Sequence, residues 1–229
     1  MRIPPPIAVL FLLDLVVVAC AIASYVISDW LGVERPAFFR LGGESNLPAW
    51  YSTSQILLIA LLFGLLAWRD FRWSRAATWT AVVPAAFFLL LSLDEGAQVH
   101  ERIGHWVWPG DASPESSAST GWILVVAPIY FLLSLVFAGA IWPYLRGRIH
   151  IVMMYVIGLG LFAFSAAGIE AIGGLTDASN DFARGLIGIF EEGGEMIAMT
   201  VLVWATFKLI DAENIRLNTA PAKPVGPAV

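Results

Sequence analysis

Acidic and histidine side chains gather in three segments of an otherwise apolar chain. The first is LSLDEGAQVHERIGHW at 91–106, which follows the apolar run VVPAAFFLLL. The second is SAAGIEAIGG and the third is GIFEEGGEMIAM, each flanked by apolar residues. Carboxylates and imidazoles are the side chains that bind divalent metal ions and transfer protons. The candidate metal-binding residues are therefore Asp94, Glu95, His100, Glu101, His105, Glu170, Glu191, Glu192 and Glu195.

The composition around these segments is that of a membrane protein. Of the 229 residues, 59% are hydrophobic and 14% are charged, whereas about 25% charge is usual for a soluble domain. Runs of about 20 apolar residues match the thickness of a bilayer core, and barrel strands would be about half as long and alternating. We expect an all-α bundle of six transmembrane helices at 7–31, 50–68, 77–104, 121–145, 150–174 and 183–210.

The chain is expected to form one transmembrane domain, residues 1–211, followed by a disordered cytoplasmic tail, residues 212–229, which is rich in Ala and Pro. Cys20 is the only cysteine, so a disulfide within the chain and a cysteine-based metal site are both excluded. No run of basic residues indicates a nucleic-acid partner. The expected partner is the lipid bilayer.

The orientation follows from the distribution of Lys and Arg, which are enriched on the cytoplasmic side. With the N-terminus inside, nine basic residues lie on the inner side and four on the outer side. Both termini are therefore expected in the cytoplasm. The inner residues are Arg2, Arg69, Arg72, Arg75, Arg146, Arg148, Lys208, Arg216 and Lys223, and the outer ones are Arg35, Arg40, Arg102 and Arg184.

In this topology the acids of the three segments share one depth. They come late in the two helices that run outward and early in the helix that runs inward, so all seven lie in the outer half of the membrane. Asp14 lies alone in the inner half and is interpreted as a hydrogen-bond partner between helices. At about 100° per residue, one stripe of the third helix carries Asp94, Gln98, Glu101 and His105.

The last helix carries a second such stripe, which includes Glu191 and Glu195. Gly185, Gly193 and Gly194 of the same helix are expected to allow close approach of neighbouring helices. The two acidic stripes are therefore expected to meet where helices pack closely.

Seven carboxylates at one depth need compensation, because each costs about 2.5–3.5 kcal/mol inside a membrane. Protons, a water-filled cavity or bound cations would supply it. Carboxylates with imidazole suit Fe, Mn or Zn, and carboxylates with water suit Ca or Mg, so the expected cofactor is Fe, Mn, Zn or Ca. The Glu-x-x-His spacing of soluble di-iron bundles is absent, and the i, i+4 pairs Glu191–Glu195 and Glu101–His105 take its place.

Three functions remain open from the residues. The first is a metal-dependent membrane enzyme at the outer face, acting on a lipid or small molecule, with Glu95 or Glu192 as general base. The second is a transporter or channel in which the carboxylates carry protons or a divalent cation. The third is a non-catalytic subunit in which a metal ties helices together. With three histidines, the chain does not fit the histidine-rich membrane desaturases and hydroxylases.

The segments SLDEGAQVHE and FEEGGEMIAM resemble a widespread group of bacterial polytopic membrane proteins. Members of that group carry an "LDE…HE" segment followed by a late "EE..EM" segment. The resemblance implies a location in the bacterial inner membrane and a shared site, and it adds weight to His100 as a ligand although helical spacing turns it away from the stripe. Matched residue by residue, it covers Asp94, Glu95, His100, Glu101, Glu191, Glu192 and Glu195.

Overall fold

The computed structural model describes residues 3–34, 36–39, 41, 46–71, 75–107, 121–169, 171–172 and 181–213. These residues form helices and turns, with no strand among them. The elements are α1 (Pro5–Leu31), η1 (Ala37–Phe39), α2 (Leu47–Phe71), α3 (Arg75–Ala97), α4 (Val99–Val107), α5 (Gly121–Leu145), α6 (Ile149–Ala163), the π-helical turn η2 (Phe164–Ile169) and α8 (Asp181–Ala212). The predicted all-α class is confirmed.

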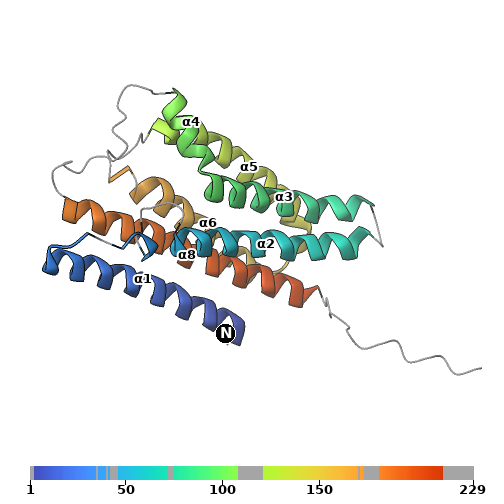
Figure 1. Ribbon diagram of the computed structural model, residues 1–229. Coiled ribbons are helices and arrows are strands. Elements are labelled where there is room, and N and C mark those ends of the chain that lie inside the picture. The colour runs from blue at the N-terminus through green and yellow to red at the C-terminus, as the bar shows by residue number, and fades with distance from the viewer. Residues whose placement is uncertain are drawn as a thin grey trace, which may run out of the picture.

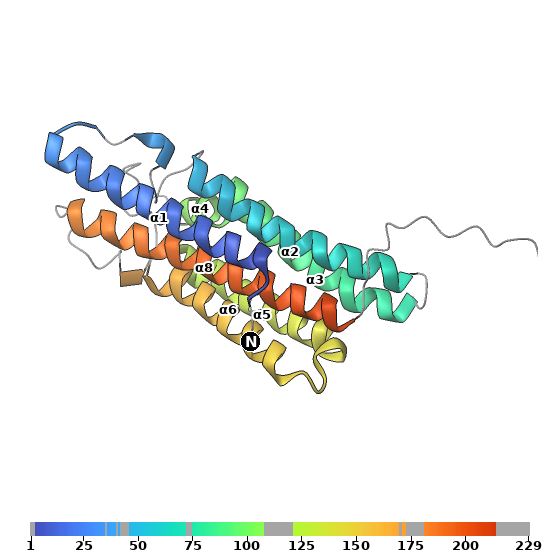
Figure 2. The same ribbon diagram turned by 90° about the horizontal axis from the view of Figure 1, so that it is seen from below.

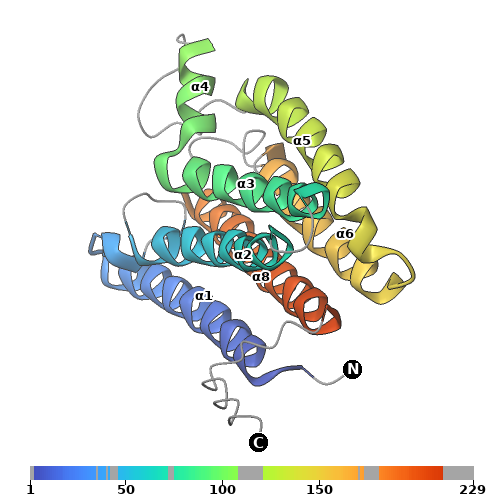
Figure 3. The ribbon, with the colours of Figure 1, turned by 90° about the vertical axis from the view of Figure 1, so that its right-hand side faces the viewer.

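The long helices lie side by side along one direction and form an elongated bundle (Figure 1). α8 contacts α1, α2 and α6, and its first half also contacts η2. α3 packs on α2 and α5, and α4 packs on α5. Seen from below, α1 and α8 run next to each other with α6 beyond them (Figure 2), and the end view places α8 beneath α2 (Figure 3). The last helix is thus the centre of the bundle.

Five helices in the described part of the chain are long and apolar enough to cross a membrane. They cover Pro5–Leu31, Leu47–Phe71, Thr78–Ala97, Ile123–Leu145 and Ile149–Ile169. Leucines on their outer faces are exposed, as lipid contact requires. The chain therefore has the architecture of a multi-pass membrane protein.

The sixth predicted span coincides with α8, which is 32 residues long but is not one of these five. Its enclosure explains its lower apolarity, because a helix covered by protein does not need apolar residues on every face. Glu195, Thr200 and Thr206 of α8 are all buried against other helices. The helix is confirmed, whereas its crossing of the membrane stays a prediction.

The third predicted helix, 77–104, is wrong as a single element. α3 ends at Ala97, Gln98 has a positive φ of 51°, and α4 begins at Val99. A residue in the left-handed region breaks helical periodicity. The single stripe predicted for Asp94, Gln98, Glu101 and His105 therefore does not exist, since residues before and after Gln98 belong to helices of different direction.

An aromatic cluster fills the bundle between α2, α3 and α5. The rings of Phe63, Phe88 and Phe137 have centroids 5.4–6.1 Å apart, and each side chain is at most 1% exposed. Tyr155 of α6 packs edge-on against Phe137 at 5.8 Å. Edge-to-face contacts of this kind stabilise beyond the area that they bury. This apolar layer separates the half of the bundle that carries Asp94, which the predicted topology places on the outer side, from the end that carries Glu213, which it places on the inner side.

Glycines let the neighbours of α8 approach its backbone. A Cβ at Gly185 would lie 2.2 Å from the Tyr25 ring of α1, and one at Gly194 would lie 2.2 Å from Ser165 Oγ of η2. Gly193 faces Val18 of α1 at 3.1 Å. The predicted role of these three glycines in close packing is confirmed.

Gly158 of α6 makes the same kind of contact with α8 and provides a test of it. A Cβ there would lie 2.6 Å from the fully buried Leu202, whereas Gly160 has open space around it. We expect Gly158→Ala to lower the free energy of unfolding by about 1–3 kcal/mol through overpacking. Gly160→Ala, the matched control, is expected to raise it by up to about 1 kcal/mol through helix propensity. Thermal unfolding in detergent compares the two, and equal midpoints would contradict the close packing.

Candidate functional site

The junction between α3 and α4 holds a carboxylate and an imidazole in direct contact. Asp94 Oδ1 accepts a hydrogen bond from the backbone N of His100 at 2.8 Å, and Asp94 Oδ2 lies 2.9 Å from His100 Nδ1. The first contact satisfies an amide in the opening turn of α4, which has no partner within its own helix. The Asp94 carboxylate therefore caps the N-terminus of α4 and also positions the imidazole ring of His100.

Packing against α2 fixes the end of α3 that carries Asp94. The buried Ser92 hydroxyl donates to the Thr53 carbonyl at 3.1 Å. A Cβ at Gly96 would lie 3.3 Å from the Thr53 methyl group, so α2 and α3 pack closely at this position. On the other side, the Tyr130 hydroxyl of α5 hydrogen-bonds the Asp94 carboxylate. Asp94 is thereby held from three helices.

The Asp94 contact selects one form of the His100 ring. A carboxylate only accepts, so Nδ1 carries the hydrogen and Nε2 carries the lone pair of the neutral imidazole. The two side chains are 9% and 19% exposed, so water competes little for this contact. Carboxylates that hold one nitrogen of a histidine in this way orient the other nitrogen toward a metal ion in many metal sites. In this geometry His100 is the candidate ligand and Asp94 the group that orients it.

The remaining predicted residues are placed as follows. Glu95 is half-buried in the last turn of α3. On α8, Glu191 and Glu192 are half-buried and Glu195 is buried. Glu101 and His105 lie on α4, but their side chains are outside the described part of the structure, and Glu170 is outside it altogether.

The structure brings Asp94 and His100 together. Among the described side chains, no three His, Cys, Asp or Glu residues form a group that could hold a metal ion. Because Glu101, His105 and Glu170 fall outside those side chains, the convergence of all nine predicted ligands stays a prediction.

Glu195 lies next to the closest contact between α8 and η2. Gly194 faces Ser165, whose hydroxyl is buried and has no hydrogen-bond partner among the described residues. Ser165 lies within the π-helical turn at the outer end of α6. Single π-helical turns inside α-helices are frequent at functional sites. The outer half of α8 therefore combines acids with a buried hydroxyl that is open to a further partner.

Asp14 fulfils its predicted role between helices. It is fully buried, and its carboxylate accepts hydrogen bonds from Tyr51 and Gln55 of α2 and from Thr200 of α8. The carboxylate joins α1 to the centre of the bundle through these three neutral groups.

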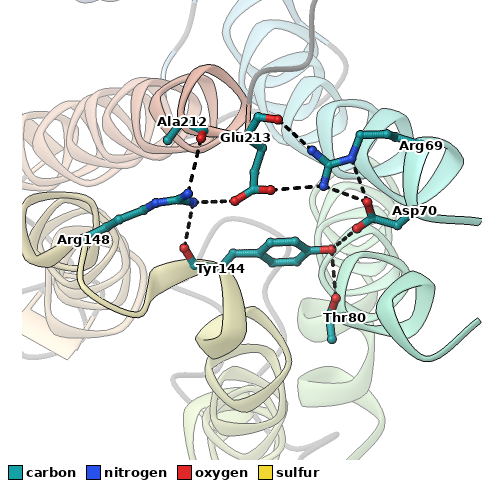
Figure 4. Close-up of polar contacts among 7 residues, drawn as sticks. All are labelled: Arg69, Asp70, Thr80, Tyr144, Arg148, Ala212 and Glu213. Carbon is teal, nitrogen blue, oxygen red and sulfur yellow. Dashed lines mark hydrogen bonds and ion pairs between the residues drawn. The ribbon is translucent and has the colours of Figure 1, made fainter. Parts of the chain in front are cut away.

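A third polar cluster closes the inner end of the bundle, and sequence reasoning missed it (Figure 4). Glu213, just after α8, lies between two arginines: Oε1 is 2.6 Å from Arg148 and Oε2 is 3.2 Å from Arg69. The same arginines donate to backbone carbonyls at the end of α8, Arg69 to Glu213 and Arg148 to Ala212. Cations favour the carbonyl end of a helix, so both groups also match the dipole of α8.

Asp70 continues this inner cluster into the neighbouring helices. It accepts a hydrogen bond from Arg69 at 2.7 Å and a short one from the Tyr144 hydroxyl of α5. That hydroxyl accepts in turn from Thr80 of α3 at 2.8 Å. In the sequence Arg69 and Arg148 indicated only orientation, and the single local signal for this cluster was the adjacent pair Arg69–Asp70.

Comparison with known proteins places the whole bundle in one family. A family model described as a domain of unknown function, DUF8692, matches residues 9–210. The chain belongs to the DUF8692 family. No curated protein matches it significantly, and neither does any solved structure. The DUF8692 match runs from α1 to the last turn of α8 and includes Asp14, Asp70, Asp94 and Glu195.

The inner cluster makes a testable contribution to stability. Replacing the carboxylate in Glu213→Gln leaves Arg69 and Arg148 without their shared anion, and hydrogen bonds to charged groups contribute about 1.5–3 kcal/mol. Because all three groups are about a quarter exposed, we expect a loss of about 1–2 kcal/mol after screening by solvent. The exposed Asp211, two residues earlier, supplies the matched control Asp211→Asn. Unchanged unfolding midpoints for Glu213→Gln would show that the ion pairs do not stabilise the end of α8.

Proposed function

We propose that this DUF8692 protein binds a divalent metal ion in the outer half of its bundle, with His100 as a ligand. The observation that carries the proposal is the contact of His100 Nδ1 with Asp94 at 2.9 Å. It fixes the tautomer in which Nε2 carries the lone pair, and metal-binding histidines share this arrangement. Burial of the pair protects the contact from exchange with water.

The metal that fits an imidazole ligand with carboxylates is Fe, Mn or Zn. Calcium takes oxygen ligands only, so it agrees less well with His100. The further ligands come from the predicted acids and from His105. These are Glu95, Glu101, His105, Glu170, Glu191, Glu192 and Glu195.

The apolar layer across the bundle favours a function carried out at the outer side over transport through the bundle. Inward of Thr200, the aromatic layer around Phe63 and Phe137 fills the described interior. At that level the hydroxyls of Tyr155 and Thr206 form a hydrogen bond with each other at 2.9 Å. A transported ion would have to cross this apolar layer. We therefore favour a metal-dependent membrane enzyme, or a metal-binding subunit, over a transporter.

We also propose that α8 is a sixth span and that both termini lie in the cytoplasm of a bacterium, with the protein in the inner membrane. Arg69, Arg148 and Lys208 lie toward one end of the bundle, the end that the positive-inside rule assigns to the cytoplasm. The two arginines meet there around Glu213.

Fusion reporters test this topology. Green fluorescent protein attached to the C-terminus is expected to fluoresce, and alkaline phosphatase inserted in 108–120 is expected to be active in the periplasm. A bundle in which α8 does not cross would place the C-terminus outside, where the fluorescent protein stays dark. A dark C-terminal fusion with an active phosphatase would therefore contradict the sixth span.

Elemental analysis tests the metal site. Protein purified with a tag that does not bind metals is expected to contain Fe, Mn or Zn in stoichiometric amount. We expect His100→Ala to lose the metal and Asp94→Asn to bind it 10–100-fold more weakly, which is roughly the effect of removing an orienting carboxylate. Glu195→Gln tests whether α8 contributes a ligand, and the exposed Glu34→Gln is the control for loss of a carboxylate.

The outcome that contradicts the metal site is equally specific. If wild type and His100→Ala contain the same trace amount of each metal after reconstitution with Fe, Mn or Zn, and both unfold at the same temperature with and without added metal, His100 is not a metal ligand. If Glu34→Gln lost as much metal as His100→Ala, the loss would not be specific to the proposed site.

A further inference from the structure

The Asp14 carboxylate lies on the seam between α1, α2 and α8 and is fully buried. Oδ1 is 2.8 Å from the Tyr51 hydroxyl and 2.9 Å from Gln55 Nε2, and Oδ2 is 2.7 Å from the Thr200 hydroxyl. These three partners are neutral groups. A buried carboxylate without a compensating positive charge is strongly unfavourable in a membrane interior.

The groups around Asp14 have fewer hydrogens to donate than there are acceptor atoms within hydrogen-bonding distance. The Tyr51 hydroxyl has one hydrogen but lies within bonding distance of two acceptors, Asp14 Oδ1 and the Leu10 carbonyl at 3.2 Å. Gln55 Nε2 has two hydrogens for Asp14, Tyr51 and Thr200 at 2.8–3.1 Å. A hydrogen on Asp14 Oδ1 would donate to Tyr51, and Tyr51 would then donate to Leu10. With one added proton, Asp14 Oδ1 and the Leu10 carbonyl no longer compete for the single hydrogen of the Tyr51 hydroxyl.

Two further oxygens of α2 are buried there without a partner among the described residues. Gln55 Oε1 belongs to the amide that contacts Asp14, and Ser52 Oγ lies one turn away on the same helix. Their residues are 2% and 6% exposed. Buried acceptors of this kind are normally satisfied, and oxygen atoms are the ligands that hard cations prefer. The cluster therefore combines a carboxylate, two hydroxyls in contact with it and an amide whose oxygen lacks a partner, with no positive charge among these groups.

From this geometry we propose that the Asp14 cluster binds one monovalent cation, a proton or a sodium ion, in the middle of the bundle. The bound charge neutralises Asp14 and lets Tyr51, Gln55 and Thr200 hold α1 against α2 and α8. The Asp14 cluster shares no residue with the metal site proposed above. Failure of the cation site would leave that proposal unaffected.

The groups that face Asp14 limit what else would respond to pH. Tyr51 is the one titratable side chain among the described groups of α2 that hydrogen-bond Asp14, and α8 presents Thr200. The nearest acid along α8 is Glu195, five residues before Thr200 and buried on that helix. Asp29, exposed near the other end of α1, provides a matched control on the same helix.

Thermal unfolding of the full-length protein in detergent separates the two cations. NaCl is replaced stepwise by choline chloride at constant ionic strength, and the series is repeated at several pH values. A sodium site raises the unfolding midpoint by several degrees as sodium increases, because a ligand that binds only the folded state stabilises it. A proton site instead lowers the midpoint as pH rises, without a sodium effect, because the folded state then binds more protons than the unfolded state.

Asp14→Asn keeps the size of the carboxyl and removes its charge. We expect it to stay folded and to lose the sodium or pH response that wild type and Asp29→Asn both show. The infrared carbonyl band of a protonated carboxylic acid, present in wild type and absent in Asp14→Asn, would identify the proton directly. A wild-type midpoint that responds to neither sodium nor pH, or a response that persists unchanged in Asp14→Asn, would overturn the proposal.

Discussion

The enclosure of α8 is the constraint on which the rest of the structure depends. Its neighbours reach it closely because Gly158 and Gly194 leave room for backbone contact. Covered on several sides by α1, α2, α6 and η2, it carries polar groups that a lipid-facing helix would expose to hydrocarbon. Glu195, Thr200 and Thr206 follow one another along this helix from the outer half inward. The bundle is thus built around a partly polar axis.

Polar side chains form three clusters in the bundle, and each cluster ties a different set of helices. One joins α3 to α4 through Asp94, one joins α1 to α2 and α8 through Asp14, and one joins α2 and α8 to the α5–α6 turn through Glu213. The aromatic layer around Phe137 lies between the last two. In each cluster the carboxylate therefore finds its partners on helices that pack directly against its own.

The sequence predicted the long helices apart from the break at Gln98, and it predicted few of their polar contacts. Apolar runs are a direct signal of length and bilayer contact, and the small size of Gly194 is visible from its letter. The break at Gln98 was missed because hydropathy continues through it, while the contact of Asp94 with His100 competes with the helix. The inner cluster was missed because Arg69 and Glu213 are 144 residues apart, and pairing at that separation exists only after folding.

The double role of Asp94 couples the short helix α4 to a half-buried imidazole ring. α4 starts at an amide held by one carboxylate oxygen, and the imidazole of the same residue is held by the other. At the far end of this helix Trp106 is 83% exposed, where indole rings rest among lipid headgroups. α4 thus carries an exposed indole near one end and a carboxylate-held imidazole at the other, so the placement of His100 is tied to the anchoring of this short helix.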